Sequence, residues 1–183
     1  TTNRYLIKVG PGVFVEDTIT LKSYVTVDGT GDSTIIEVDS TSKDVIVLVG
    51  SSNLQNVTLQ GSTDSGKAAL TVASTMGPGV SCGIDNIVFG ATDNLFRSAL
   101  GAGQFAIVSI VGGVTGSDSN FTNGYDISGD GYTTISLANS KSSVNIAVTD
   151  YIKIQGANNR FIMSDNGLLV QGALGGSVSN FVR

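Results

Sequence analysis

The sequence contains no histidine, no tryptophan, one cysteine and two prolines. Without histidine, a histidine general base and imidazole metal ligands are both excluded. The lone cysteine, Cys82, cannot form an intramolecular disulfide and has no neighbours at metal-ligand spacing. We expect Cys82 to be a small buried apolar residue, with a reactive thiol as the alternative. The lack of tryptophan weakens the case for a row of exposed aromatic rings that would bind carbohydrate.

Charged residues are also scarce, at 14% of the chain. The 10 basic residues are scattered singly and the net charge is −5, so no basic stripe is present to neutralise phosphates and nucleic acid is not an expected partner. No apolar run is long enough to predict a membrane-spanning helix. The chain begins without methionine or a signal-like segment. We therefore expect residues 1–183 to be one domain that is a fragment or processed part of a longer protein.

What the chain has in abundance is glycine and β-branched residues, which favour an all-β fold. Short apolar runs, such as Val45–Val49 and Tyr151–Ile154, are separated by Gly, Ser, Asn and Asp clusters. Two segments, Lys67–Gly83 and Asp93–Gln104, interrupt this pattern. They are expected to form loops or a short helix, with Asp93 as an N-cap.

The segment Tyr5–Glu37 is the most informative, because it holds three short β-rich runs separated by Gly-containing corners at Gly10–Gly12 and Gly29–Asp32. Runs this short, joined by such corners, are typical of a parallel β-helix. The segment resembles the first coils of the pectin-lyase-like right-handed β-helix superfamily. The predicted fold is a single-stranded right-handed parallel β-helix of about six to eight coils with loop insertions. The side chains expected to point inward are Val25, Val27, Ile35, Val47, Val57, Leu59, Ile87 and Phe89.

A recurring phrase places asparagine between apolar residues, at Asn56 and again at Asn86, with fainter echoes at Asn120 and Asn180. Asparagine tolerates the left-handed backbone of a corner, and its amide can bond an equivalent residue one coil away. We interpret these positions as β-helix corners; coincidence in an Asn- and Val-rich sequence is the alternative. The spacing from Asn56 to Asn86 exceeds one bare coil and predicts a bulging loop.

The superfamily that the segment resembles includes enzymes, and the resemblance implies that their site residues could occur in this chain. Gly12–Glu16 looks like an early phrase of pectinesterases. The later aspartates of those enzymes, and their arginine beside a tryptophan, have no match in this sequence. Pectate lyases need acidic residues around Ca²⁺ and an arginine base, and polygalacturonases need a histidine. The arginines Arg4, Arg97, Arg160 and Arg183 are each solitary in the sequence.

The best remaining acidic cluster is Asp126–Gly131. Asp126 and Asp130 are a weak Ca²⁺ candidate or an acid/base pair for glycoside cleavage, the alternative being an ordinary Asp-Gly turn. The glycines of Asp28–Asp32 resemble a phosphate loop, but no Lys-Ser/Thr follows them. No cofactor is expected. The remaining loop aspartates read as solvated charges: Asp39, Asp44, Asp64 and Asp118.

With no catalytic set recognised, we interpret the chain as a non-enzymatic structural or assembly module of a phage virion (tail fibre, spike or decoration protein) or of an extracellular filament. It is then expected not to cleave pectin. The alternative is a polysaccharide-binding or polysaccharide-degrading protein, pectinase-like or depolymerase-like, with a site between subunits. The expected partners are further copies of the chain or other virion or surface subunits, with a glycan as another candidate. The expected location is the virion or the cell exterior.

Overall fold

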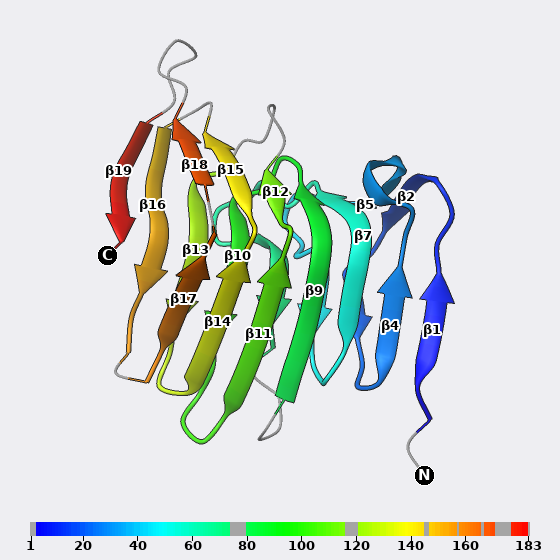
Figure 1. Ribbon diagram of the computed structural model, residues 1–183, viewed down its shortest axis with the longest axis horizontal. Helices are drawn as coiled ribbons and strands as arrows, with labels where there is room; N and C mark the ends of the chain where they lie inside the picture. The colour runs from blue at the N-terminus through cyan, green and yellow to red at the C-terminus, as the bar shows by residue number, and fades with distance from the viewer. Residues whose placement is uncertain are drawn as a thin grey trace.

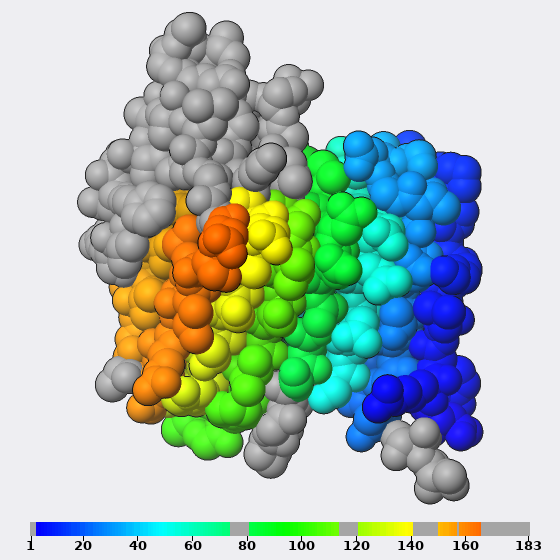
Figure 2. Space-filling model, in the orientation of Figure 1, coloured from blue at the N-terminus to red at the C-terminus, as the bar shows by residue number. Residues whose placement is uncertain are grey.

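The computed structural model describes residues 3–73, 80–115, 121–144, 147–156, 158–165, 167–170 and 177–182. Its strands run parallel and wind into a β-solenoid (Figure 1). The surface accordingly appears as successive bands from the N-terminal to the C-terminal end (Figure 2). The winding amounts to about five turns, slightly fewer than the sequence predicts. The predicted all-β parallel β-helix is confirmed.

Two sheets form the wall of the solenoid. Sheet A has a main path whose order is β1 (Tyr5–Lys8), β4 (Val25–Asp28), β7 (Asn53–Gln60), β9 (Val80–Phe89), β11 (Phe105–Val111), β14 (Tyr132–Ala138) and β17 (Arg160–Ser164). Beyond a corner, the same sheet continues through β2 (Gly12–Glu16), β5 (Thr34–Val38), β12 (Val114–Thr115), β15 (Lys141–Val144) and β18 (Gly167–Val170). Sheet B contains β3 (Ile19–Leu21), β6 (Ile46–Leu48), β8 (Ala68–Val72), β10 (Asn94–Ala99), β13 (Asn123–Ser128), β16 (Ala147–Ile154) and β19 (Ser177–Val182). A 3₁₀ turn, η1, spans Gly31–Ser33.

The corner within sheet A is built on asparagine, as predicted. Asn56 and Asn86 have φ of 56° and 50°, and the Asn86 side-chain amide donates to Oδ1 of Asn56 at 2.8 Å. Asn139 and Asp165 also have positive φ, at 51° and 54°. Asn180 instead lies within β19, and Asn120 lies outside the described residues. The loop predicted between Asn56 and Asn86 overlaps residues 74–79, which are also outside them.

The core is a continuous apolar column inside the winding. Five of the predicted inward side chains are buried there, namely Val27, Val57, Leu59, Ile87 and Phe89, and Val25 packs against them. Cys82 is buried in the same core, as predicted.

The prediction is wrong for Ile35 and Val47, because in these strands the inward positions belong to Ile36, Ile46 and Leu48. Side chains alternate along a strand, so an error of one residue exchanges the two faces.

The two segments expected to be loops or helix contain strands in their described residues. β8 (Ala68–Val72) and the start of β9 lie within Lys67–Gly83, of which residues 74–79 are outside the described part, and β10 occupies half of Asp93–Gln104. Backbone groups of β10 pair with β8 and β13 on the neighbouring coils, and this pairing overrides local helix preference. Asp93 accepts from the backbone N–H of Gly66 at 2.7 Å, so it ties two coils together. Among the described residues, no helix is long and apolar enough to cross a membrane.

Candidate functional site

A column of polar side chains follows the outer face of sheet B. Thr71, Arg97, Asp126 and Lys153 occupy the same register position on β8, β10, β13 and β16. Each lies between inward-facing neighbours along its own strand, as strand alternation requires. Adjacent strands are about 4.8 Å apart, so the column presents one polar group per coil along the solenoid axis. We call these four residues the sheet B column.

Two ion pairs hold the column. Lys153 Nζ lies 3.2 Å from Oδ2 of Asp126, and Arg97 Nη2 lies 3.3 Å from Oδ2 of Asp44. Asp44 also accepts from the backbone N–H of Ala68 at 2.9 Å. The side chains of Asp44 and Asp126 are only 13% and 18% exposed. Both carboxylates are therefore fixed in a partly desolvated setting, where charge–charge interactions are stronger than in open water.

Two buried oxygen atoms of the column have no hydrogen-bond partner within the part of the chain that the structure describes. They are Oγ1 of Thr71 and Oδ1 of Asp126. A buried acceptor without a partner costs free energy, and each one in a native structure calls for a reason. Asp44 differs, because both of its carboxylate oxygens are engaged. Among the described residues, Asp126 thus retains an unused carboxylate oxygen, whereas Asp44 does not.

The core behind Asp126 holds its strand rigidly. Tyr125 is buried, with its ring edge-on to Tyr151 and Phe161 at centroid distances of 6.0 and 5.1 Å. Burial raises the pKa of the Tyr125 phenol well above its usual value, so the group stays neutral. Next to it, Gly124 leaves the space that Tyr151 uses, since a Cβ at Gly124 would lie 2.3 Å from the Tyr151 carbonyl oxygen. This close approach sets β13 firmly against β16 and so fixes Asp126 beside Lys153.

Asp126 and Asp130, which the sequence offers as a pair, face different sheets. Asp126 lies on the outer face of sheet B, whereas Asp130 lies beyond the corner at Gly129 and lines a pocket with Phe105 and Tyr132 of sheet A. No group of three or more His, Cys, Asp or Glu residues is arranged to hold a metal ion among the residues described. A Ca²⁺ site at Asp126 or Asp130 remains a prediction.

Two sequence interpretations change with this geometry. Arg97 is not solitary and Asp44 is not a solvated loop charge, because they form an ion pair. The column itself was missed, since its members come from successive coils and no contiguous motif contains two of them. The available signal was their spacing of about one coil: Lys153 follows Asp126 by 27 residues.

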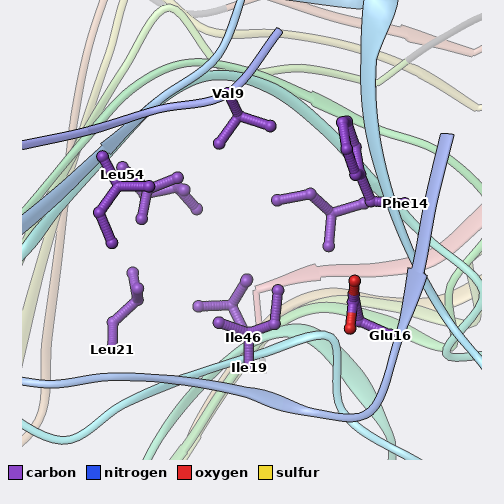
Figure 3. A pocket seen from close by; sticks show the side chains of 10 residues that line it. Val9, Phe14, Glu16, Ile19, Leu21, Ile46 and Leu54 are labelled. Atoms are coloured by element: carbon purple, nitrogen blue, oxygen red, sulfur yellow. The ribbon is translucent and has the colours of Figure 1, made fainter. Parts of the chain in front are cut away.

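A second feature is an apolar cavity of about 240 Å³ at the N-terminal end of the core. Figure 3 shows Glu16 among the apolar side chains around it, including Phe14, Ile19 and Leu54. Glu16 ends the Gly12–Glu16 phrase noted in the sequence, and this phrase forms β2. The cavity is the open interior of the first coil, and none of the described residues that line it brings a second reactive group to the Glu16 carboxylate.

Comparison with solved structures identifies the fold. Pectin methylesterase PemA from Erwinia chrysanthemi superposes with a TM-score of 0.52 at 13% identity, over 85% of this chain and 58% of that one. The chain has the pectin-lyase-like right-handed β-helix fold. This chain spans little more than half the length of that enzyme. The resemblance seen in Tyr5–Glu37 is confirmed for the fold.

Two further pectin methylesterases give similar matches. One, in complex with a hexasaccharide, has a TM-score of 0.47 at 14% identity over 90% of this chain and 58% of its own. The other, from Yersinia enterocolitica, has a TM-score of 0.47 at 13% identity over 85% and 62%. No protein-family model matches the sequence. No curated protein sequence matches it significantly.

The comparison corrects the functional interpretation. PemA is a pectin methylesterase, so the prediction of a non-enzymatic virion or filament module is wrong, and the pectinase-like alternative agrees better with the finding. The physical reason is that a β-helix gathers its site from separate coils. A search for catalytic phrases in the sequence therefore overlooks side chains such as Arg97, Asp126 and Lys153, which only the winding places in register.

Proposed function

We propose that the chain binds and processes a uronate-containing polysaccharide on the outer face of sheet B, with Asp126 as the working carboxylate. The observation that carries this proposal is the register alignment of Arg97, Asp126 and Lys153, together with the unpartnered buried Oδ1 of Asp126. The shared fold of PemA, a pectin methylesterase, supports the same substrate class. Because these polysaccharides lie outside cells, we also propose an extracellular location.

The cations of the column suit a substrate that carries carboxyl or ester groups. The Arg97 guanidinium has five N–H donors, and its ion pair with Asp44 uses one of its terminal nitrogens. The remaining donors can bind a carboxylate or an ester carbonyl oxygen in the planar geometry that arginine favours. Lys153 holds Oδ2 of Asp126 and leaves Oδ1 as an acceptor. An extended polymer lying along the axis would meet one of these groups on each coil.

Ester hydrolysis fits this arrangement better than glycoside cleavage by two carboxylates. Glycosidases of that type need a second free carboxyl group opposite the first, and Asp44 is committed to Ala68 and Arg97. In the proposed step, the Asp126 carboxylate takes a proton from water while the water oxygen bonds to the ester carbon. Arg97 stabilises the oxyanion. The ester C–O bond then breaks, and the departing alcohol takes the proton from Asp126.

The test combines turnover and binding on methylated and de-esterified pectin. Alcohol release measures turnover, and calorimetric titration with oligogalacturonate measures binding. We expect Asp126→Asn to lower the turnover rate about 10²- to 10⁴-fold, the usual contribution of a positioned general base. The matched control is Asp32→Asn, at an exposed aspartate in η1, which should behave as wild type.

Each outcome is decisive. Binding without alcohol release would support a polysaccharide-binding protein in place of an esterase. The absence of both binding and turnover, on both polysaccharides, would overturn the proposal. Full activity in Asp126→Asn would overturn it too.

Assembly of the chain with further copies also stays a proposal. The first strands expose apolar side chains, including Tyr5, Leu6 and Val13, at 60%, 59% and 59%. Sedimentation at micromolar concentration tests it, and a monomer would contradict it.

A further inference from the structure

Two aromatic rings stack on adjacent coils at the start of the strands in sheet A. Phe105 opens β11, Tyr132 opens β14, and the two residues are register partners. Their ring centroids lie 5.0 Å apart with an interplanar angle of 20°. Both residues are half-buried. Phe105 covers one face of the Tyr132 ring, and Asn158 lines the same pocket as the two rings.

Polar groups surround the stacked rings in an open pocket of about 360 Å³. The pocket is lined by Gln104, Phe105, Asp130, Tyr132 and Asn158, together with two glycines. Within the described parts of the chain, neither the Asp130 carboxylate nor the Tyr132 hydroxyl has a hydrogen-bond or ion-pair partner. None of the described residues that line the pocket is a lysine or an arginine. It therefore combines an apolar platform with an unpaired negative charge and an amide.

The turns that carry these groups are tied to neighbouring coils. Asn159 accepts from the backbone N–H of Thr133 at 3.0 Å, and the backbone N–H of Tyr132 donates to the Gln104 carbonyl at 2.9 Å. Gly129 has a φ of 96°, and a Cβ there would lie 2.3 Å from the Leu100 carbonyl oxygen. The pocket is thus held in place before any ligand arrives, which lowers the entropy lost on binding.

The chemistry of these groups selects a sugar. A pyranose ring has an apolar C–H face that can pack on an aromatic ring, and a rim of hydroxyl groups that donate and accept hydrogen bonds. An ionised carboxylate offers only acceptors and suits two neighbouring hydroxyl groups. An amide such as Asn158 can both donate and accept. The charge of Asp130 would repel a uronate or a phosphate, so the pocket suits a neutral sugar.

We propose that Phe105, Tyr132, Asp130 and Asn158 form a binding site for a neutral pyranose, distinct from the sheet B column. It lies on another face of the solenoid and has the opposite charge preference, because the column offers Arg97 and Lys153. The inference does not rest on the proposed esterase function. A protein with both sites would hold a neutral branch or a neighbouring neutral polysaccharide while the column engages an acidic chain.

The test is calorimetric titration with neutral hexasaccharides of xylose, galactose, mannose and glucose, and with hexagalacturonate for comparison. We expect at least one neutral sugar to bind, Tyr132→Ala to raise its Kd about 10-fold or more, and Tyr132→Phe to keep most of the affinity through stacking. Asp130→Asn should raise the Kd of the neutral sugar several-fold while removing the repulsion of hexagalacturonate at this pocket. Tyr5→Ala, at an exposed tyrosine on β1, is the matched control and should bind as wild type.

The Asp130→Asn variant separates loss of the binding site from loss of the fold. Asp130 is exposed and has no bonding partner among the residues that the structure describes, so its replacement leaves the fold intact. Circular dichroism confirms the fold of each variant. Absence of binding by all four neutral sugars would overturn the proposal. Unchanged affinity in both Tyr132→Ala and Asp130→Asn would overturn it too, because the sugar would then bind elsewhere.

Discussion

The side-chain amide of Asn86 donates to Oδ1 of Asn56 at 2.8 Å, one coil away at the same corner. Asn56 in turn donates to Oδ1 of Asp28 at 2.8 Å, and Lys8 forms an ion pair with the same aspartate. The corner is therefore a ladder of side-chain bonds that runs parallel to the solenoid axis. Both asparagines also have the left-handed backbone that the bend requires.

Replacement of Asn56 should separate these two roles. Asn56→Ala loses the amide bonds, worth about 1 kcal/mol each. It keeps a Cβ in the left-handed region, which costs about 1–2 kcal/mol, without the local side-chain hydrogen bonding that lets asparagine tolerate this backbone. Asn56→Gly loses the bonds but relieves the strain, so it should cost less. Urea unfolding measures both. Asn53→Ala is the control, at an exposed asparagine with an ordinary backbone, and equal losses in the Ala and Gly variants would contradict the account.

The correction of the β5 register makes a second prediction. Ile36 is 4% exposed and faces the core, whereas its neighbour Ile35 faces outward. Ile36→Ala should lower the free energy of unfolding by about 2–5 kcal/mol, the range for a buried isoleucine. Ile35→Ala should cost less than about 1 kcal/mol, as outward-facing substitutions do. The reverse order in a thermal melt would mean that the strand presents its other face to the core.

Asp28 should make the free energy of unfolding depend on pH in the acidic range. The hydrogen bond from Lys8, followed by those from Asn56 and Gln55, lowers the pKa of Asp28 from 3.8 to about 2. A carboxyl group whose pKa is lower in the folded state stabilises the fold fully above its unfolded pKa and loses that contribution as the pH falls through the folded one. The stability difference between wild type and Asp28→Asn should therefore be constant above about pH 5 and shrink between about pH 4 and 2. Urea midpoints across this range measure it, and a difference independent of pH would refute the link.

The thiol of Cys82 should be inert in the native protein. Cys82 is buried, its Sγ donates to the Gly50 carbonyl at 3.2 Å, and burial raises the pKa of the thiol. The nucleophilic thiolate is therefore rare, and reagents cannot reach it. Ellman's reagent should react with the native chain far more slowly than with the chain in concentrated guanidinium. Rapid native reaction would show that the wall of the solenoid opens at Gly50.

The sequence by itself determined the class of fold and its corners. Short β-rich runs parted by glycine predict a parallel solenoid, because each run can bury its apolar face only against the coils beside it. Asn56 and Asn86 were identifiable because a left-handed corner accepts few residues other than asparagine, aspartate and glycine. Local preference failed at Asp93–Gln104, where pairing with neighbouring coils makes β10 a strand.

Only the tertiary structure decided which side chains meet. Asp126 and Asp130 are close in sequence, yet the corner at Gly129 sends them to different faces. Asp126 and Lys153 are far apart in sequence, yet parallel pairing makes them neighbours. The same holds for the stack of Phe105 on Tyr132. In a solenoid, contacts between side chains are set by the number of residues that each coil uses, and that number varies with every loop, so local patterns fix the strands while the winding fixes the sites.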